Sequence, residues 1–460
     1  MQSASPIASA SPADAPSLAV IGAGLRSTVY AQRARSTGAA RIVAVAEPDP
    51  VRRERFAREH GIPAENVFSG WEDLLAGERL ADGVIIGTQD RMHTGPAVAA
   101  AGKGYHILLE KPIAPTEEEA TRILAAAEEN DVILAVCHVM RYSPYTRALR
   151  TILEDGTIGQ VINVQHLEQV GWWHHAHSFV RGNWRKEAES ASLLLAKACH
   201  DVDWLAYMMG AIPQRVSSFG TLTHFTAAAR PEGAADRCWD CPLEAICPYS
   251  AKRLYLGCLG DPEKEFWPLS AVTEDATPEG VERALRTGPY GRCVYACDND
   301  VVDTQTVSLE FGTGATATIT VTAFAALEHR KTRIFGTHGS IDGDGRHLRI
   351  HDFVSDSWTE IDTGGGDDAS MAGGHGGADE SLADAFFSAL RHDDPSRILS
   401  SGRESLDTHR VVWAAETARK QGTVVTIPPS PDRPAPAIPP TALSATHLSM
   451  TQQEESEYTA

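Results

Sequence analysis

The chain has 460 residues, of which 42% are hydrophobic and 22% are charged, a composition typical of globular proteins. Lys and Arg together number 41 and Asp and Glu 61, so the formal net charge is −20 at pH 7. This charge argues against a nucleic-acid-binding protein, because phosphate contacts need clustered Lys and Arg. It favours a small-molecule partner, and the length indicates two to three domains at roughly 150 residues each.

The two ends of the chain differ in composition from the rest. Residues 1–16 are rich in Ser, Ala and Pro, and residues 428–460 begin with a Pro-rich stretch and continue with polar sequence. Both are predicted to be disordered tails. No apolar run approaches the ~20 residues of a membrane helix, and the first residues lack the basic and apolar regions of a secretory signal. We therefore expect a cytoplasmic protein with no membrane partner.

Strands and helices alternate over residues 17–140. Strands are predicted at 18–21, 41–46, 83–87, 105–109 and 132–137, with helices after the first strand and at 51–60, 96–103 and 116–130. Thr116 and Glu119 form a capping box at the start of the last helix. Such alternation predicts right-handed crossovers and a parallel sheet, as in a Rossmann domain.

Residues 141–427 have a different pattern. Strands are predicted at 161–168, 215–223, 306–311, 315–323, 331–335, 340–343 and 346–354, and helices at 192–209, 380–391 and 402–421. This predicts an α+β domain with a large open, mainly antiparallel sheet, whose helices lie on one side and whose open face is free for oligomerisation. Residues 232–292 interrupt the pattern, contain clustered cysteines and are interpreted as an insertion.

A Gly-rich turn follows the first strand and opens a helix. Gly22 permits the tight turn, Gly24 lets the backbone approach a pyrophosphate, and Ser27 is a small residue at the third position of the pattern. Glu47 ends the second strand. A carboxylate there can accept hydrogen bonds from ribose hydroxyls and would repel the 2′-phosphate of NADP. The alternative is an ordinary strand–turn–helix unit.

The sequence Glu110-Lys111-Pro112 follows the predicted strand at 105–109. Ligands of parallel sheets bind at the carboxyl ends of the strands, so Lys111 is placed to reach one. A Lys ammonium can bond a substrate hydroxyl and assist proton transfer. A surface Glu–Lys pair is the alternative for this dipeptide taken alone.

These motifs occur in the order and spacing of a known family. With residues 88–93, Arg141-Tyr142-Ser143-Pro144, residues 156–160, His200 and residues 336–340, they resemble the glucose–fructose oxidoreductase, inositol dehydrogenase and rhizopine-catabolism (Gfo/Idh/MocA) family. The resemblance implies an NAD cofactor, an open-faced sheet domain and dimers or tetramers. It implies these cofactor-binding positions: Gly22, Gly24, Leu25, Arg26, Ser27, Glu47, Thr88, His93, Glu110 and Lys111.

The resemblance also implies that Lys111 is the catalytic lysine and that His200 meets the substrate hydroxyl. In the family an Asp lies four residues before that His, but Ala196 stands at that position here. On one continuous helix, Lys197 and Asp203 would lie about 60° to either side of His200. We hypothesise that Lys197 replaces the missing acid or holds Asp201, and that Asp203 orients His200. The alternative for Lys197 is a structural lysine at a helix edge. The alternative for His200 is a histidine buried in the core.

An aromatic and His-rich segment spans residues 172–185. Aromatic rings stack on sugar faces, and Arg and His donate to hydroxyls or anions. We expect a substrate loop here, with plain structure or a metal site as alternatives. The candidate substrate residues are Trp173 and Arg185 in this segment, and His138, Tyr142 and His375 elsewhere.

Four cysteines have a grouped spacing. Cys238, Cys241 and Cys247 lie close together, and Cys293 follows about fifty residues later. In a reducing compartment such a group favours a metal over disulfides. A structural Zn site is the first expectation, and an Fe–S cluster or free thiols are the alternatives.

These features predict an NAD-dependent oxidoreductase that transfers hydride between the nicotinamide and a hydroxyl of a sugar, polyol or glycoside. One alternative is an NAD-dependent glycosidase, which oxidises the sugar transiently, eliminates the aglycone and reduces the product with the same cofactor. Another is a non-catalytic sensor. We expect a homodimer or homotetramer.

Overall fold

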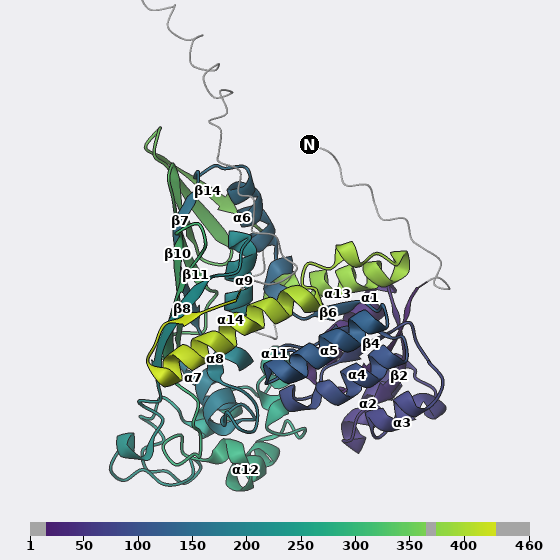
Figure 1. The fold of residues 1–460 in the computed structure, drawn as a ribbon. Helices are drawn as coiled ribbons and strands as arrows, with labels where there is room; N and C mark the ends of the chain where they lie inside the picture. Colours follow the sequence, from purple (N-terminus) through teal and green to yellow (C-terminus); the bar gives the residue numbers. More distant parts are fainter. Residues whose placement is uncertain (1–14, 365–373, 429–460) are drawn as a thin grey trace, which may run out of the picture.

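The structure is a computed structural model that describes residues 15–364 and 374–428. It has two sheets, which meet along helices in the middle of the molecule (Figure 1). The predicted disordered tails therefore fall almost entirely outside the described residues. No helix within the described parts of the chain is long and apolar enough to cross a bilayer.

The first sheet has six strands in the order β3-β2-β1-β4-β5-β6. Each strand pairs in parallel with its neighbours, as predicted for a Rossmann domain. The strands are β1 (Ser17–Ile21), β2 (Arg41–Ala46), β3 (Val67–Phe68), β4 (Gly83–Ile86), β5 (His106–Leu109) and β6 (Leu134–Val136). Strand β3 was not predicted, because two residues carry no readable periodicity.

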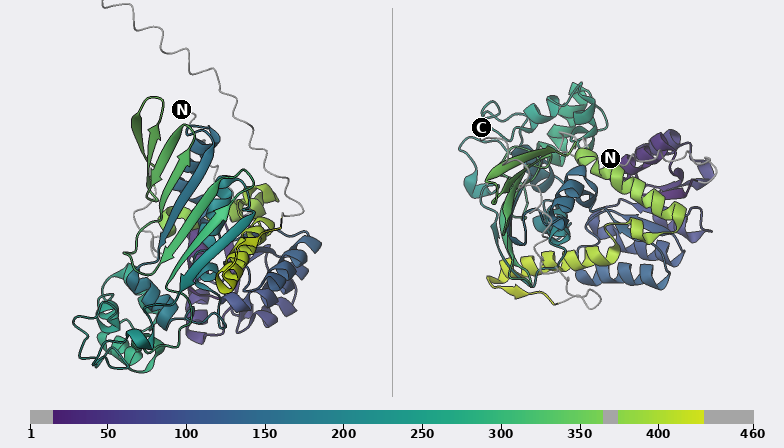
Figure 2. Two further views of the ribbon diagram at one scale, coloured as in Figure 1. Left: turned by 60° about the vertical axis from the view of Figure 1, so that its left-hand side comes forward. Right: turned by 90° about the horizontal axis from the view of Figure 1, so that it is seen from above.

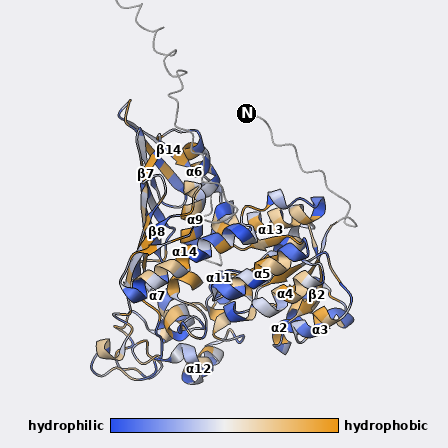
Figure 3. Ribbon diagram, viewed as in Figure 1, coloured by the Kyte–Doolittle hydropathy of each residue, from blue (hydrophilic) through white to orange (hydrophobic). Residues whose placement is uncertain are grey.

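Helices cover both faces of this sheet. They are α1 (Leu25–Thr37), α2 (Pro50–His60), α3 (Trp71–Ala76), α4 (Thr94–Gly102), α5 (Glu117–Glu129) and, from the far end of the chain, α13 (Gly374–His392). Leu18 and Val20 of β1 pack into a core with α1 and α13, whereas Ala19 and Ile21 pack against α4 and α5. Figure 3 shows hydrophobic and hydrophilic residues interspersed along α5 and α13. The Thr116 hydroxyl caps α5, as predicted.

The second sheet has nine strands in the order β14-β13-β12-β11-β7-β10-β9-β8-β15. Strands β7 and β10 pair in parallel and the other neighbours are antiparallel, so the prediction of a mainly antiparallel sheet is confirmed. The strands are β7 (Val161–Gln169), β8 (Arg215–Thr221), β9 (Thr304–Glu310), β10 (Thr316–Thr322), β11 (Lys331–Gly336), β12 (Gly339–Gly343), β13 (His347–Asp352), β14 (Ser357–Asp362) and β15 (Val425–Thr426).

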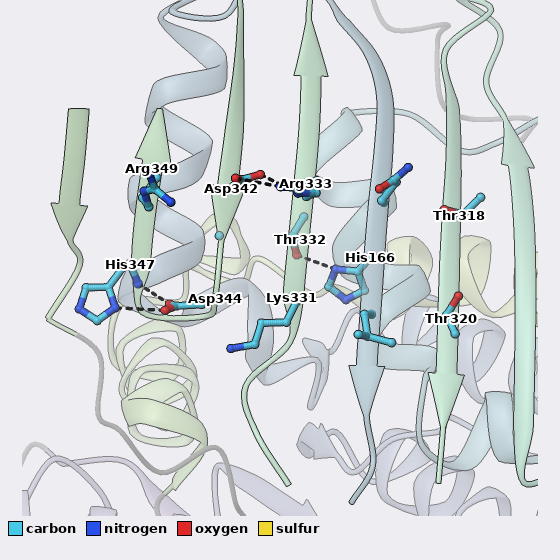
Figure 4. A pocket seen from close by; sticks show the side chains of 13 residues that line it. His166, Thr318, Thr320, Lys331, Thr332, Arg333, Asp342, Asp344, His347 and Arg349 are labelled. Carbon is cyan, nitrogen blue, oxygen red and sulfur yellow. Dashed lines mark hydrogen bonds and ion pairs between the residues drawn. The ribbon is translucent and has the colours of Figure 1, made fainter. Parts of the chain in front are cut away.

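Helices cover only one face of this sheet (Figure 2). Helices α6 (Pro144–Glu154), α9 (Cys199–Met209) and α14 (Gly402–Gln421) supply that core. In β10 the residues Ala317, Ile319 and Val321 are buried, and the threonines between them point to the open face. A depression of about 580 Å³ lies on the sheet near Thr318, Lys331 and Arg333 (Figure 4). None of the predicted catalytic or cofactor residues lines it.

A long segment is inserted between two neighbouring strands. Strands β8 and β9 pair directly, yet residues 222–303 separate them in sequence. The segment contains α10 (Ala251–Leu256), α11 (Pro262–Phe266) and α12 (Pro278–Thr287), and these helices share a small core that includes Tyr255 and Leu285. The predicted insertion, residues 232–292, lies within this segment.

A buried ion pair joins the two sheets. Arg141, in the short helix η4 (Val139–Tyr142) that follows β6, donates two hydrogen bonds of 2.7 Å each to Asp203 of α9. Thr408 of α14 donates to the same carboxylate at 3.0 Å. Arg141 and Asp203 are both almost fully buried. Three segments from distant parts of the sequence therefore meet at one charge pair.

Replacing Arg141 with Met should destabilise the fold by about 3–5 kcal/mol, because Asp203 would remain buried without its countercharge. Chemical denaturation followed by circular dichroism measures the change. The exposed pair Arg333–Asp342 provides the control, and Arg333→Met should cost less than about 1 kcal/mol. Equal losses for the two variants would contradict a structural role for Arg141.

Candidate active site

The Gly-rich turn has the geometry that a pyrophosphate site requires. Gly22 has φ of +83°, and a Cβ there would lie 2.9 Å from the carbonyl oxygen of Gly87. Gly24 is the N-cap of α1 and has no side-chain cap, so the first amides of the helix, at Leu25, Arg26 and Ser27, are left for a ligand. Ser27 packs against Gly87 so closely that a Cβ on Gly87 would clash with its hydroxyl.

Glu47 lies directly beside this turn. Its Oε2 accepts a hydrogen bond of 2.9 Å from the amide of Ala23, and its Oε1 accepts one of 2.9 Å from the amide of Asp49. Arg52 lies 3.2 Å from the same Oε1. The carboxylate is buried and oriented at the end of β2, which is the position predicted for contact with a ribose.

Arg26 does not point along the turn. Its guanidinium donates to Glu110 at 2.8 Å and to both oxygens of Asp379, at 2.6 and 2.8 Å. The Tyr30 hydroxyl also donates to Glu110, at 2.9 Å. Burial raises the pKa of Glu110, but Arg26 and Lys111 outweigh that effect and hold it below its usual value. The Arg26 side chain therefore ties α1 to β5 and α13, and the part of Arg26 that faces the expected cofactor position is its backbone amide.

His93 and Thr88 differ in their hydrogen bonding. The His93 ring is buried, with Nδ1 2.9 Å from the Pro112 carbonyl oxygen and Nε2 3.2 Å from that of Thr88. Through these contacts the ring holds two strand-end loops together. The Thr88 hydroxyl is buried without a hydrogen-bond partner among the described residues, so it is available to a ligand.

The helix predicted over residues 192–209 is broken. Helix α8 (Leu193–Ala196) ends at Lys197, which has φ of −115° and ψ of −60°, and α9 begins at Cys199. The carbonyl of Ala196 accepts a hydrogen bond of 2.7 Å from Nζ of Lys111. A main-chain oxygen thus meets the predicted catalytic lysine from the position where the family has its Asp.

His200 lies at the start of α9 in a group of buried histidines. Its ring is 5.6 Å from that of His138, which is 5.5 Å from that of His409. Burial, followed by Lys111 and His138, holds the pKa of His200 well below its usual value. Burial also lowers the pKa of His138 to about 3 and that of His409 to about 4. His200 is therefore an uncharged imidazole near pH 7.

Lys197 does not lie on a helix face with His200, because the helix breaks at this residue. Its Nζ lies 3.3 Å from Oε1 of Glu168 in β7, so it is not a solvent-exposed residue at a helix edge either. Burial lowers the pKa of Lys197, although Glu168 opposes this effect. Asp201, the other expected partner, instead binds His166 and Arg330, each at 2.9 Å.

Three further candidates have structural partners. Asp203 was expected to orient His200, but its carboxylate accepts hydrogen bonds from Arg141 and Thr408. Tyr142 is buried, and its hydroxyl accepts a hydrogen bond of 2.8 Å from the amide of Leu399. Arg185 pairs with Asp298 at 3.0 Å. These contacts engage the polar groups of Tyr142 and Arg185 within the protein.

The remaining substrate candidates are His138, His375 and Trp173. His138 is fully buried, and neither ring nitrogen makes a hydrogen bond in the described structure, although Nδ1 lies 3.7 Å from Oδ2 of Asp203. His375 lies 2.9 Å from Asp379, and burial lowers its pKa against the effect of that carboxylate. Trp173 packs against Trp267 of the insertion with ring centroids 5.2 Å apart. Residue 373 of the Gly-rich stretch before His375 lies outside the described residues.

The histidines of the 172–185 segment mostly have aromatic partners. His175 stacks between Phe179 and Phe225, and His177 stacks on Tyr290. In the described ranges no group of three or more His, Cys, Asp or Glu side chains is placed to hold one metal ion. The metal alternative for this segment and the zinc expectation for Cys238, Cys241, Cys247 and Cys293 therefore have no support from the geometry.

The sequence matches a known family over both sheets. The profile described as "Oxidoreductase family, NAD-binding Rossmann fold" of the Gfo/Idh/MocA group matches residues 17–138, and that of its C-terminal alpha/beta domain matches residues 150–427. The chain therefore belongs to the Gfo/Idh/MocA oxidoreductase family, as the motifs predicted. The membership makes it an NAD-binding oxidoreductase.

Individual relatives are distant. YteT of Bacillus subtilis (strain 168), an oxidoreductase by its name, is 24% identical over 410 residues, which are 82% of this chain and 90% of YteT. The 2,7-anhydro-N-acetylneuraminate hydratase of Escherichia coli (strain K12) is 29% identical over 172 residues, or 37% of this chain and 44% of the hydratase. Its match thus spans less than half of that enzyme.

Solved structures share the fold. An oxidoreductase from Agrobacterium radiobacter, in complex with NAD+, L-tartaric acid and magnesium, has a TM-score of 0.65 and 16% identity, and the match covers 90% of this chain and 98% of that one. Levoglucosan dehydrogenase, in complex with NADH and levoglucosan, has a TM-score of 0.65 and 18% identity over 90% of this chain and all of the other.

Sequence reasoning missed several residues of the site. Glu168 and Arg330 form an ion pair of 2.7 Å beside Lys197, and Asp379 fixes Arg26. A signal for Glu168 existed, because the period-two pattern of β7 places it on the buried face with Val164 and His166. Arg330 precedes its strand and Asp379 comes from a distant helix, so no local pattern identifies either residue.

The buried histidines should make the fold sensitive to mild acid. A depressed folded pKa means that the unfolded chain binds the proton first, so stability is lost as pH falls from about 6.5 towards the folded values. His175, with a pKa lowered by burial to about 3, illustrates the effect. At pH 5 each such group should cost about 2 kcal/mol.

The urea midpoint at pH 7.5, 6 and 5 measures this loss. His175→Phe keeps the ring stack and removes the proton site, so it should be more stable than the unaltered protein at pH 5 and close to it at pH 7.5. His392→Phe, at the exposed end of α13, is the control. A midpoint that does not change with pH would contradict the buried neutral histidines.

Proposed function

We propose that this protein transfers a hydride between a hydroxyl-bearing carbon of a sugar, polyol or glycoside and the nicotinamide of NAD. The observation that carries the proposal is the contact of Lys111 with Ala196, because it brings the lysine at the end of β5 to the helix break that precedes His200. Sugar-related names among the relatives, including 1,5-anhydro-D-fructose reductase and levoglucosan dehydrogenase, support the substrate class.

The described residues offer the cofactor three points of contact. The uncapped amides of Leu25 to Ser27 and the positive φ of Gly22 suit a pyrophosphate, and the unpartnered Thr88 hydroxyl suits a polar group of the bound cofactor. We assign Glu47 to the ribose hydroxyls. When bound, NAD supplies the hydride acceptor.

Lys111 and His200 have the proton-transfer role in this proposal. The Lys111 ammonium is held by a neutral carbonyl oxygen, and the remaining N–H donors can bind the substrate hydroxyl. His200, kept neutral by burial, accepts the hydroxyl proton as the C–H bond breaks. We retain Lys197 as a positioning residue, since its pairing with Glu168 holds the chain directly after Ala196.

The second candidate function is net elimination or hydration with cofactor recycling, of which the glycosidase is one form. The similarity to two hydratases of 2,7-anhydro-N-acetylneuraminate supports this second candidate function. The two candidates differ in stoichiometry, because a dehydrogenase makes one NADH per turnover whereas recycling makes none. A panel of sugars and glycosides, read both by NADH absorbance and by released product, decides between them.

Three further properties belong to the proposal. We propose a division near residue 140 between the cofactor and substrate domains, and a homodimer or homotetramer formed through the open face of the second sheet. The eight cysteines are all free thiols, which suits a reducing compartment such as the cytoplasm.

Lys111→Ala should lower turnover by at least about 10²-fold, the usual effect of losing an acid–base group. Affinity for NAD, measured by isothermal titration calorimetry, should stay within a few-fold, because the pyrophosphate amides are untouched. Lys103→Ala removes a lysine at the exposed end of α4 and is the matched control. Near-normal turnover in Lys111→Ala would remove this lysine from the mechanism.

Glu47→Ala should weaken NAD and reduce the preference for NAD over NADP, because the carboxylate that repels a 2′-phosphate is lost while Arg52 remains. The ratio of kcat/KM for the two cofactors measures the preference. Glu65→Ala, on the exposed surface before β3, is the control. Equal use of both cofactors by the unaltered protein would contradict the assignment.

A further inference from the structure

The start of α13 holds one histidine in an uncommon backbone conformation. His375 has φ of +50° and ψ of +43°, and Gly376 and Gly377 follow with φ of +68° and +88°. This left-handed region is sterically unfavourable for a residue with a Cβ, and such residues persist where other contacts fix them, often at functional sites. A contact outside the local backbone is therefore expected to hold His375 in place.

Asp379 provides that contact. Nδ1 of His375 lies 2.9 Å from Oδ2 of Asp379, which is fully buried. An ionised carboxylate only accepts hydrogen bonds, so the ring donates from Nδ1, and a neutral ring then carries its lone pair on Nε2. Nε2 has no hydrogen-bond partner within the described parts of the chain, and the side chain is 22% exposed. Asp379 thus fixes both the orientation and the tautomer of the imidazole.

The same carboxylate is connected to Lys111. Arg26 donates to both oxygens of Asp379 and to Oε1 of Glu110. Oε2 of Glu110 accepts a hydrogen bond of 3.1 Å from the amide of Lys111. Burial raises the pKa of Asp379, but Arg26 and His375 outweigh this effect and keep the carboxylate ionised. Three hydrogen-bonded side chains therefore connect His375 to the backbone of Lys111.

His375 also borders the charged group around Lys197. It lines a cavity of about 50 Å³ together with Arg330. Arg330 pairs with Glu168 at 2.7 Å, and Glu168 lies 3.3 Å from Nζ of Lys197. His375 is also close enough to His200 to contribute to the lowering of its pKa. The far end of the chain therefore brings one more titratable group to the surroundings of the candidate active site.

We propose that His375, oriented by Asp379, is a second acid–base residue of this site, and that its Nε2 removes a proton from the carbon next to the one that is oxidised. The inference rests on the proposed function and specifies its second form, in which a sugar is oxidised transiently and then loses a leaving group. A plain dehydrogenase needs one proton acceptor, which Lys111 and His200 already provide. A second imidazole with its own orienting carboxylate is what an elimination would add.

The proton that His375 would remove becomes acidic only after the oxidation. Hydride transfer converts the hydroxyl-bearing carbon into a carbonyl, and the hydroxyl proton goes to His200. The neighbouring C–H bond can then release its proton, because the electron pair delocalises into the carbonyl. As Nε2 of His375 takes that proton, a C=C bond forms and the C–O bond of the leaving group on the next carbon breaks. The departing oxygen keeps the electron pair of that bond and takes a proton from water.

The electrostatic surroundings of His375 suit a base. Burial lowers its pKa and Asp379 raises it, and the balance leaves an uncharged imidazole near pH 7. Arg26 and Lys197 also act on the ring, and both lower its pKa. After protonation the imidazolium would lie 2.9 Å from an ionised carboxylate, which stabilises the new charge.

The test uses the full chain with NAD in D₂O and a panel of methyl glycosides of glucose, galactose, mannose and N-acetylglucosamine, together with levoglucosan. Mass spectrometry measures the deuterium taken up next to the oxidised carbon, and NADH absorbance in a single turnover measures the hydride step. With a sugar that is oxidised, the unaltered protein should incorporate deuterium. His375→Asn should slow incorporation by at least about 10²-fold, the usual effect of losing an acid–base group, and keep the rate of NADH formation within a few-fold.

Asn preserves most of the local structure at this position. Its side-chain amide can still donate to Asp379, and Asn tolerates the left-handed backbone, but it lacks the second nitrogen. His392→Asn, at the exposed end of the same helix, is the matched control and should change neither rate. If His375→Asn fails to fold, as judged by circular dichroism, His375→Gly suits the same backbone and makes the same test.

Other results overturn the proposal. Unchanged incorporation in His375→Asn would assign the proton to another base, and equal loss of incorporation and of NADH formation would mean that His375 acts in binding or in positioning. NADH formation without deuterium uptake by the unaltered protein would leave a plain dehydrogenase and remove the elimination step. If no member of the panel produces NADH in a single turnover, the proposed function fails, and the inference fails with it.

Discussion

The hydrogen bond from Lys111 to the carbonyl oxygen of Ala196 is the contact on which the candidate active site depends. It exists because the helix after Ser192 is interrupted at Lys197, where the backbone leaves the helical course. A continuous helix would engage that carbonyl with the amide four residues later. The break therefore provides a neutral acceptor for the lysine at the position where the family has a carboxylate.

Charged residues around this contact are partitioned into separate buried groups. Arg26 joins Glu110 and Asp379, Arg141 joins Asp203, and Arg330 joins Glu168 and Asp201. Each group pairs its charges internally, as buried charges must. His200 and His138 are left among these groups as neutral rings, which is the state a proton acceptor needs.

The positions of the site residues were partly readable from the sequence. Gly22, Glu47 and Lys111 lie where the strand–turn–helix pattern placed them, because each follows directly from the end of a buried strand. The roles of Arg26, His93 and Asp203 were not readable in this way. Their partners come from β5, α13, the loop at Pro112 and η4, and nothing local to each residue identifies a partner so far away in the chain.

Apolar periodicity, glycines and short motifs are local properties of the chain. They were enough to predict the parallel Rossmann sheet, the mainly antiparallel second sheet and the family. Tertiary structure alone decided where the helix at Lys197 breaks, which acid pairs with which base, and that Cys293 joins Cys238 around one cavity. These outcomes depend on segments that meet only after folding, when the cost of burying a charge or a thiol is set by whatever lies opposite.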